Sequence, residues 1–330
     1  MNDNRYRMNV CTSLNDNYAK YTCVMLRSLF MNNPDAEVYV YLLQDSLSDI
    51  SQGILRDTCD EFSNHLYVLN VDVDRIDTRI RTTANWGMET NFRLQMFDLL
   101  PDDIDRLLYL DVDMVIINSI KDLYQMDFKD KEIIASRDMP LTDEKIDDYK
   151  YSRHERFYDI IDRKEYFNAG MILFNMDKIR GAYDLNSFLH LAEDVDFKIY
   201  APDQDLLNLL FDGKSEIVDP YRYDFFANVG IDRGYDYEKT KQSVAIVHFT
   251  GKKPWSGGDH IHFSIEKLWW DYALQTVYRD VFLEEYTLGS VSDETVREYI
   301  KGLLKEITVL KNDLNSAIES FNKLYSVINK

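Results

Sequence analysis

Two carboxylates close one of the most apolar segments of the chain. Leu107-Leu108-Tyr109-Leu110 is followed directly by Asp111-Val112-Asp113. Oxygen donors at a strand end suit a hard divalent cation such as Mn²⁺ or Mg²⁺, which can in turn hold a diphosphate. Because side chains alternate along an extended strand, joint binding of one ion requires a turn that begins at Val112. Most Asp-x-Asp pairs in an acidic chain are solvated, so the pair alone does not establish a metal site.

A histidine closes a second apolar run. His248 follows Val244-Ala245-Ile246-Val247, and Gly251-Lys252-Lys253-Pro254-Trp255 comes shortly after it. A histidine at the end of a strand is often a structural residue. A flexible glycine and two ammonium groups behind it are what a third metal ligand beside a phosphate clamp would require.

A third polar cluster, Asp203-Gln204-Asp205, follows Ala201-Pro202 and precedes an apolar helical pattern. Its simplest interpretation is a helix start with acidic residues in the first turn. The three cysteines, Cys11, Cys23 and Cys59, have no C-x-x-C spacing and predict buried thiols in a reducing, cytoplasmic setting. We expect no secretory signal, because the chain moves from Met1-Asn2-Asp3-Asn4-Arg5 directly into a strand-like stretch.

Strand-like runs alternate with helical patterns, which predicts an α/β fold with a mainly parallel, Rossmann-like sheet and helices on both faces. Ligands bind beyond the carboxyl ends of such strands, so 12–18 and 111–113 should meet at one rim. The predicted helices run from about Tyr21 to Pro34, from Ser48 to about Phe62 and over Thr90–Leu100. The predicted strands are Tyr6–Thr12, Ala36–Leu43, His65–Val71, Arg106–Ile117, Glu132–Ser136, Phe167–Met176, Glu216–Asp219 and Val244–Phe249.

The composition narrows the class of protein. The 330 residues carry a formal charge of −20, which argues against a binder of nucleic-acid phosphates. An apolar fraction of 45% is enough for a packed core. The apolar runs are far shorter than the roughly 20 residues that a membrane span needs, so we expect no transmembrane segment.

Two segments stand apart from the α/β pattern. The charged stretch Asp138–Glu165 suits an exposed lid over a bound substrate. The last segment, 289–330, has apolar residues in an unbroken 4-3 spacing from Val296 to Ile328 and predicts one long helix, from Ser292 to Lys330. This helix can dock on its own domain or form a coiled-coil homodimer. We therefore expect a catalytic domain over 1–288 and a helical extension over 289–330.

Six ordered segments resemble glycosyltransferase family 8, whose members are retaining enzymes of the GT-A fold and include bacterial lipopolysaccharide galactosyltransferases and glycogenin. The resemblance covers roughly Met8 to Trp255. The segments are Thr12-Ser13-Leu14-Asn15-Asp16-Asn17-Tyr18, Asn91-Phe92-Arg93, Tyr109-Leu110-Asp111-Val112-Asp113, Phe167-Asn168-Ala169-Gly170, Asp203-Gln204-Asp205 and His248-Phe249-Thr250-Gly251 with Lys253-Pro254-Trp255.

The resemblance implies a UDP-sugar donor, a carbohydrate-bearing acceptor and a Mn²⁺ or Mg²⁺ ion held by Asp111, Asp113 and His248. Gln204, Asp203 and Asp205 become the candidate catalytic residues. The implied uridine contacts are Thr12, Asn15, Asn17 and Tyr18. The other implied donor contacts are Ser13, Arg93, Val112, Asp138, Asn168, Ala169, Gly170, Gly251, Lys252 and Lys253. Only Lys252 stands between Gly251 and Lys253-Pro254-Trp255, where relatives often have two residues, so Lys252 could share the clamp role. Asn15 stands where a relative has Asp.

Two other classes of protein are compatible with parts of this pattern. A metal-dependent phosphohydrolase also uses Asp-x-Asp after a strand, but it would need the pair after the first strand, which here ends in Thr12-Ser13. A non-catalytic, nucleotide-sugar-binding scaffold would explain the tail and leave the ordered segments without a role. The sequence therefore favours a hexosyltransferase.

Overall fold

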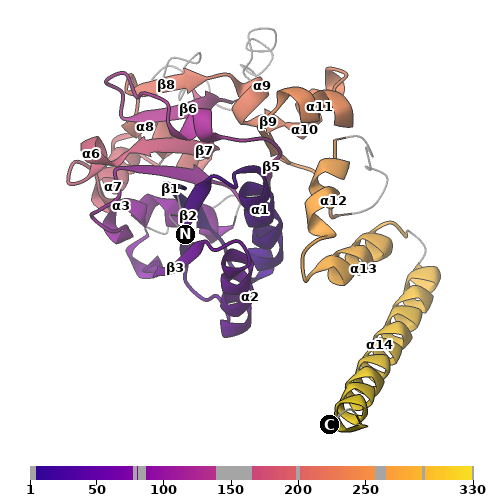
Figure 1. The fold of residues 1–330 in the computed structure, drawn as a ribbon. Helices are drawn as coiled ribbons and strands as arrows, with labels where there is room; N and C mark the ends of the chain where they lie inside the picture. Colours follow the sequence, from indigo (N-terminus) through magenta and orange to yellow (C-terminus); the bar gives the residue numbers. More distant parts are fainter. Residues whose placement is uncertain are drawn as a thin grey trace.

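The computed structural model describes residues 5–76, 80, 87–138, 166–197, 201–256, 265–291 and 294–328. At its centre is a seven-stranded sheet in the order β3-β2-β1-β4-β7-β6-β8 (Figure 1). Only β7 is antiparallel to its neighbours, β4 and β6, so the predicted mainly parallel sheet is confirmed. The strands are β1 (Tyr6–Ser13), β2 (Ala36–Gln44), β3 (His65–Asn70), β4 (Arg106–Leu110), β6 (Ile133–Arg137), β7 (Phe167–Asn175) and β8 (Ser215–Val218).

The first half of the sheet is built by strand-helix-strand units. Helix α1 (Ala19–Asn32) ends just before Pro34, as expected, and buries a face of nine residues against the sheet. Helix α2 (Asp49–Asp60) begins at Ser48, whose hydroxyl accepts a hydrogen bond from the Ser51 backbone at 3.2 Å. In β1 and β2 nearly every side chain is buried, as in a sheet covered on both faces.

The prediction of one strand over Arg106–Ile117 is wrong. The chain leaves the main sheet after β4, turns through Asp111-Val112-Asp113 and enters β5 (Met114–Ile116). Strand β5 belongs to a second sheet with the order β5-β10-β9, formed with β10 (Ile246–His248) and β9 (Phe225–Phe226). Apart from Arg106, the residues of β4 and β5 are apolar or aromatic and strand-forming, so periodicity could not show the change of sheet. The turn at Val112 brings the ends of β4 and β10 together.

The segment over Thr90–Leu100, expected to be one α-helix, is mostly a 3-10 helix. It consists of η4 (Met88–Gln95) followed by a single turn, α3 (Met96–Leu99). Side-chain bonds to the backbone replace part of the α-helical ladder. The Thr90 hydroxyl donates to the Gly87 carbonyl, and Arg93 Nε donates to the Thr90 carbonyl, both at 3.0 Å.

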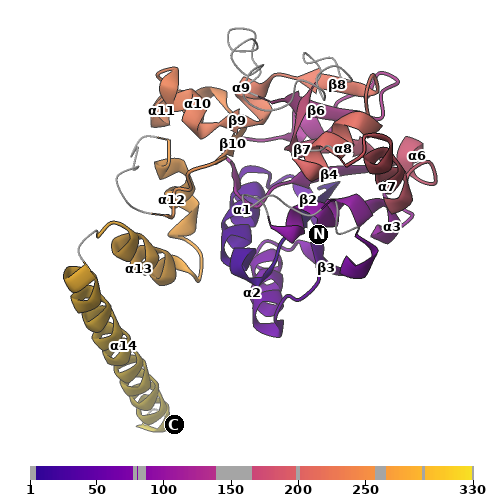
Figure 2. The same ribbon diagram turned by 180° about the vertical axis from the view of Figure 1, so that it is seen from behind.

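Helices cover both faces of the main sheet (Figures 1 and 2). One buried cluster lies under α1 and α2, a second under η4, α7 and α8, and a third around the small sheet and α12. All three cysteines are buried and free, and burial raises the pKa of Cys23 to about 12, as expected for structural thiols. The further elements are η1 (Asp16–Tyr18), η2 (Val73–Arg75), α4 (Lys121–Tyr124), α6 (Met176–Ile179), α7 (Leu185–Asp194), α8 (Pro202–Leu210), α9 (Pro220–Tyr223), α10 (Ala227–Asp232) and α11 (Tyr237–Ser243).

The chain ends in three helices, α12 (Lys267–Ala273), α13 (Arg279–Gly289) and α14 (Glu294–Ile328). As predicted, the tail is one long helix over its described residues, and it projects away from the body (Figure 2). Within the described ranges, no helix is long and apolar enough to cross a membrane. The predicted lid, Asp138–Glu165, lies outside the described residues except for Asp138.

Candidate active site

Asp111, Asp113 and His248 form one cluster at the junction of the two sheets. One ligand atom from each lies within 4.8 Å of the others. The turn after β4 supplies both carboxylates, and His248 at the end of β10 pairs with Met114 in the register of the small sheet. The sequence had placed these residues at strand ends, and the turn at Val112 directs them to one point. The donor set is the one expected for a hard divalent cation.

A buried carboxylate fixes the orientation of His248. Asp224 has no exposed surface, and its Oδ1 lies 2.8 Å from His248 Nδ1. The other ring nitrogen, Nε2, lies 3.1 Å from Asp113 Oδ1 and 4.0 Å from Asp111 Oδ2. Burial opposes protonation of the ring, but the charges of Asp113 and Asp224 outweigh burial and raise the pKa of His248 to about 10. A neutral ring with Nδ1–H on Asp224 would present Nε2 as a ligand.

The charges at this cluster fit a bound cation. The Lys253 ammonium contacts Asp113 Oδ2 and also donates to the Phe249 carbonyl at 2.8 Å. Among the described residues, Asp113 Oδ1 and Asp224 Oδ2 are buried and make no well-directed hydrogen bond. Three carboxylates thus surround one imidazole, with Lys253 as a counter-charge on Asp113. The segment 249–255, called the clamp loop below, follows His248. Its Gly251 has a φ of +74°, which lets the clamp loop turn back toward the cluster.

Gly170 on β7 is packed against the cluster. A Cβ at this position would lie 2.6 Å from His248 Cε1 and 2.8 Å from Asn168 Oδ1. The Gly170 carbonyl accepts a hydrogen bond from the Asp111 backbone at 2.9 Å. The glycine therefore lets β7 approach the histidine and anchors the start of the turn that carries both carboxylates.

Arg93 links the metal-ligand cluster to the Asp203-Gln204-Asp205 segment. Its guanidinium, buried and stacked on Tyr109, donates to Asp111 Oδ1 at 2.8 Å and lies 3.0 Å from Asp203 Oδ2. Nη1 donates to the Ala169 carbonyl at 2.6 Å. Burial raises the pKa of Asp203, although Arg93 opposes this shift. Three segments that are far apart in the sequence therefore meet at one arginine.

Gln204 is held in one orientation by four hydrogen bonds. Its amide oxygen accepts from Asn168 Nδ2 and from the Ala169 backbone, both at 3.0 Å. Its amide nitrogen donates to Asp138 Oδ2 and to the Tyr166 hydroxyl, both at 3.1 Å. This amide lies at the start of α8, beside the start of β7.

Asp205, the last residue of the Asp203-Gln204-Asp205 segment, is held by two hydrogen bonds from the protein. The Asp205 side chain is buried. Its Oδ1 accepts a hydrogen bond from the Tyr166 hydroxyl at 2.6 Å, and its Oδ2 accepts one from the Ala201 backbone N–H at 3.1 Å. The second bond satisfies the free N–H next to the helix start, as the simple interpretation of this segment expects. Both of its oxygens are therefore engaged by the protein.

The loop 12–18, expected from the sequence to contact uridine, contains buried and exposed residues. Thr12 and Ser13 are buried in β1, and the Ser13 hydroxyl contacts the Tyr109 hydroxyl at 2.7 Å. Asn15 donates to Glu89 Oε1 at 2.6 Å and accepts from the Asn17 backbone at 3.0 Å. Asn17 and Tyr18 are exposed. Asn17 and Tyr18 thus remain open to a planar base, whereas Thr12 and Ser13 support the loop from below.

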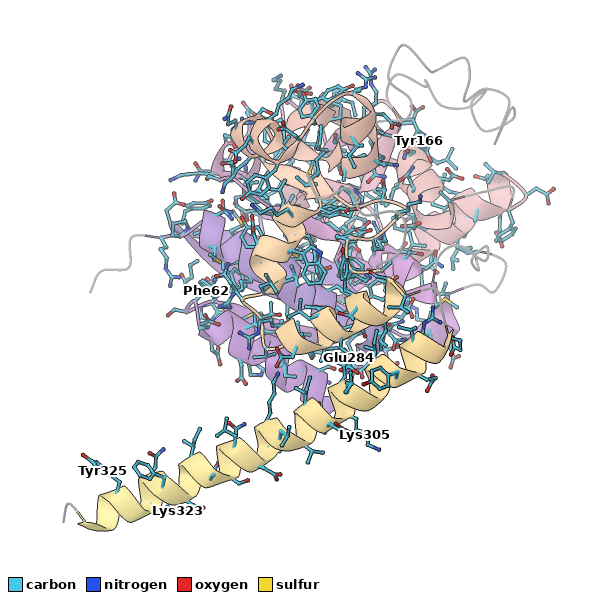
Figure 3. The ribbon with its side chains drawn as sticks, turned by 90° about the vertical axis from the view of Figure 1, so that its right-hand side faces the viewer. Phe62, Tyr166, Glu284, Lys305, Lys323 and Tyr325 are labelled. Carbon is cyan, nitrogen blue, oxygen red and sulfur yellow. The ribbon has the colours of Figure 1, made fainter. Side chains whose placement is uncertain are left out.

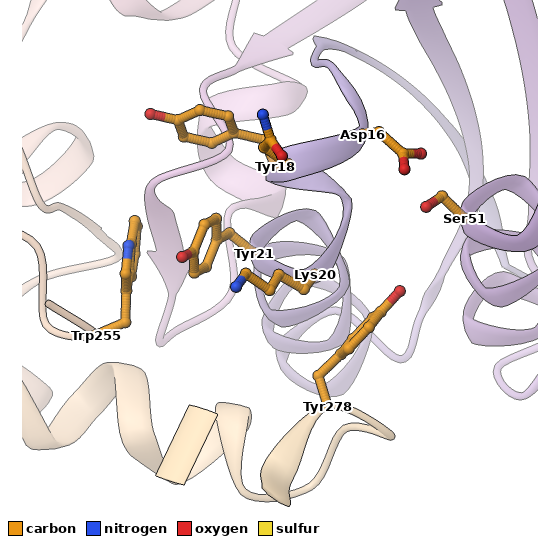
Figure 4. A pocket seen from close by; sticks show the side chains of 8 residues that line it. Asp16, Tyr18, Lys20, Tyr21, Ser51, Trp255 and Tyr278 are labelled. Carbon is orange, nitrogen blue, oxygen red and sulfur yellow. The ribbon is translucent and has the colours of Figure 1, made fainter. Parts of the chain in front are cut away.

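A hollow of about 480 Å³ lies on the outer side of this loop (Figure 4). Tyr21 stacks on Trp255 at 4.0 Å between ring centroids and on Phe282 of α13 at 5.8 Å. This aromatic junction fixes the end of the clamp loop against α1 and α13. The lining residues are Asp16, Asn17, Tyr18, Lys20, Tyr21, Ser51, Trp255 and Tyr278.

Three residues at this site were not found from the sequence. Asp224 and Glu89 lie in segments whose pattern carries no catalytic signal, and only the pairing of β9 with β10 and the packing of η4 bring them in. Tyr166 directly precedes the Phe167-Asn168-Ala169-Gly170 segment, and that neighbourhood was the one signal that could have found it. Lys252, by contrast, was predicted and is exposed on the clamp loop.

The comparisons with known proteins identify the family and agree with the fold. Residues 9–258 match the sequence model described as "Glycosyl transferase family 8", so this chain belongs to that family. The lipopolysaccharide 1,2-glucosyltransferase of Escherichia coli is 23% identical over 85% of this chain and 79% of its own length. The lipopolysaccharide 1,3-galactosyltransferase of Salmonella typhimurium (strain LT2) is 24% identical over 76% of this chain and 73% of its own length.

Solved structures confirm the GT-A fold. The galactosyltransferase LgtC, crystallised with donor and acceptor sugar analogues, superposes with a TM-score of 0.68 at 22% identity. The match covers 82% of this chain and 96% of LgtC. The family match over residues 9–258 and this fold together confirm the resemblance seen in the sequence, and the family match defines the class of protein as a glycosyltransferase.

Proposed function

We propose that this chain is a retaining, metal-dependent hexosyltransferase that moves glucose or galactose from a UDP-sugar to a glycan, glycolipid or glycoprotein acceptor. One observation carries the proposal: Arg93 joins the Asp111, Asp113 and His248 cluster to Asp203, next to Gln204. A cation-binding group and a sugar-binding group are thus held side by side.

Transfer from a nucleoside diphosphate develops negative charge on the diphosphate and positive charge on the sugar ring. Asp111, Asp113 and His248 would hold a divalent ion, which supplies Lewis-acid stabilisation of the leaving diphosphate. Lys253 is close enough to share that role, since it already contacts Asp113. With Asp113 engaged as a ligand, the Lys253 ammonium would be able to donate to a phosphate oxygen instead.

The sugar side of the site has to stabilise an oxocarbenium-like ring. We favour front-face attack with the Gln204 amide oxygen beneath the ring, over a covalent intermediate on Asp203 or Asp205. Asp205 has both oxygens engaged, and Asp203 is paired with Arg93. Gln204 is fixed by four hydrogen bonds, two of which its amide oxygen accepts. A nucleophile would have to give up such bonds to attack, whereas an oxygen that only stabilises the charge on the ring can keep them.

The donor and acceptor follow from the relatives and not from this site. The E. coli and Salmonella relatives act on lipopolysaccharide, one as a glucosyltransferase and the other as a galactosyltransferase. Discrimination between the two epimers depends on one hydroxyl and on which polar side chain the wrong epimer leaves unpaired. We therefore propose that the donor is a UDP-hexose, either UDP-glucose or UDP-galactose.

The first prediction concerns UDP binding measured by titration calorimetry with and without Mn²⁺. The wild-type chain should bind UDP in a Mn²⁺-dependent manner, and Asp111→Ala with Asp113→Ala should abolish that dependence. Circular dichroism must show that the double variant still folds. Unchanged UDP affinity in the folded variant would contradict the metal site.

Product analysis separates the three classes of protein. A panel of nucleotide sugars followed by NMR should show release of UDP and an α-linked product. Release of inorganic phosphate would indicate the phosphohydrolase, binding without turnover of any sugar would indicate the scaffold, and a β-linked product would contradict retention.

A further inference from the structure

Helix α14 exposes a continuous apolar stripe. It is 35 residues long, which corresponds to about 52 Å of helix. Along its a and d positions Leu310, Leu314 and Phe321 are 66%, 59% and 64% exposed. An isolated helix of this kind does not keep such a stripe in water.

The protein's own body covers only one flank of the first half of this helix. Ile300 and Leu304 are partly shielded, and Lys311 forms an ion pair with Asp280 of α13 at 2.6 Å. Beyond this pair the helix stands clear of the body: Figure 3 shows Lys323 and Tyr325 on the free part. The a and d residues of the stripe from Leu303 to Phe321, called the seam below, therefore face solvent.

The charges beside the seam identify the partner. In the heptad register set by Ile300, Ile307, Leu314 and Phe321 at a, the charged residues of the e flank are basic and those of the g flank are acidic. The e flank carries Arg297 and Lys311 beside the apolar Leu304, Ile318 and Tyr325, and the g flank carries Glu306 and Asp313. In a parallel pair each g flank faces the e flank of the other helix, which brings opposite charges together. In an antiparallel pair, e would face e and g would face g, so like charges would meet.

We propose that α14 pairs with α14 of a second copy of this chain as a parallel, two-stranded coiled coil. In this register Glu306 of one copy meets Lys311 of the other, twice per dimer. The a/d pattern extends over more than four heptads, enough for a stable coiled coil. The ion pair between Lys311 and Asp280 is exposed and contributes little stabilisation, so Lys311 can pair with Glu306 of the second copy instead.

An anionic lipid surface is the less suitable occupant. The helix carries five acidic and five basic residues between Glu294 and Ile328, so it has no net attraction for anionic headgroups. A membrane-binding helix would instead concentrate Lys and Arg along one polar face.

The test measures the mass of the full chain by light scattering and the dimer dissociation constant by sedimentation. The wild type should have twice the 39.0 kDa of one chain. Leu314→Asp should give the monomer, whereas the matched control Val309→Asp, at an exposed position away from the seam, should leave the dimer intact. A monomeric wild type, or equal effects of both variants, would overturn the proposal.

Charge reversal tests the parallel register. Glu306→Lys and Lys311→Glu should each raise the dissociation constant on the order of tenfold, and the double variant should return it toward the wild-type value. Lys305→Glu, on the outer face, is the control for charge alone. If the double variant is as weak as the single ones, the parallel register is wrong. Binding of the monomer to phosphatidylglycerol vesicles, lost in Leu314→Asp, would identify a membrane as the partner and overturn the dimer.

Discussion

At the scale of single residues, the site depends on the buried carboxylates that flank the imidazole of His248. His248 lies between Asp113 and Asp224, and both carboxylates make charge-assisted contacts to its two nitrogens. Because Asp224 is buried with no exposed surface, its charge acts on the imidazole with little screening. Asp224 is therefore a positioning residue: it holds the ring, and it does not reach the proposed substrate.

Asp224→Asn tests this role. The amide preserves the shape and can still accept a hydrogen bond from Nδ1, but it removes the charge that favours the imidazole as a ligand. We expect Mn²⁺-dependent UDP binding to weaken by about 10- to 100-fold, as measured by calorimetry, with the fold retained. Asp232→Asn, on the exposed surface of α10, is the control. Equal affinity in the Asp224 and Asp232 variants would show that Asp224 has no influence on the metal.

At the scale of elements, the site is created by the close approach of strands from two sheets. Strand β7 approaches β5 and β10 at Gly170, where no side chain separates them. The carboxylates, the histidine and the Asn168 amide can then converge, although they come from elements spread over more than 130 residues.

Gly170→Ala should disrupt this approach. The added Cβ would collide with His248 and Asn168, so the ring must shift, which costs about 1–3 kcal/mol of stability and abolishes Mn²⁺-dependent UDP binding. The matched control is Gly53→Ala in α2, where a Cβ meets nothing within 4 Å. That variant should be more stable by about 0.5–1 kcal/mol and bind normally. Thermal melts and calorimetry measure both effects; normal binding by the Gly170 variant would show that the packing is dispensable.

The same elements show what the sequence could predict. Local signals were sufficient for α1, which Pro34 ends, for α2, which Ser48 caps, and for Asp111 and Asp113 at the end of β4. The change of sheet at Val112 was not predictable, because β4 and β5 are equally apolar and only long-range pairing separates them. Asp224 was missed for the same reason: its role depends on the pairing of β9 with β10, and nothing in its neighbourhood marks it.

At the scale of the whole molecule, the catalytic body and the long helix are joined through α13. Phe282 is fully buried and packs on Trp269 at 5.0 Å and on Tyr21 at 5.8 Å between ring centroids. Helix α13 is thus anchored on α1 and α12 without help from α14, and Tyr21 and Trp269 connect it to Trp255 of the clamp loop. The family match also ends at residue 258, before either helix begins. We therefore expect chemistry and assembly to be separable.

Truncation after Gly289 tests that separation. The shortened chain keeps α13 and its buried Phe282, so UDP affinity in the presence of Mn²⁺ should equal that of the full chain. It loses the apolar seam, so light scattering should show a monomer where the full chain is a dimer. The opposite outcome, lost UDP binding with an unaltered oligomeric state, would mean that α14 supports the catalytic body through α13. The boundary at 288 would then be misplaced, because the helix would contribute stability to the body rather than contact to a second chain.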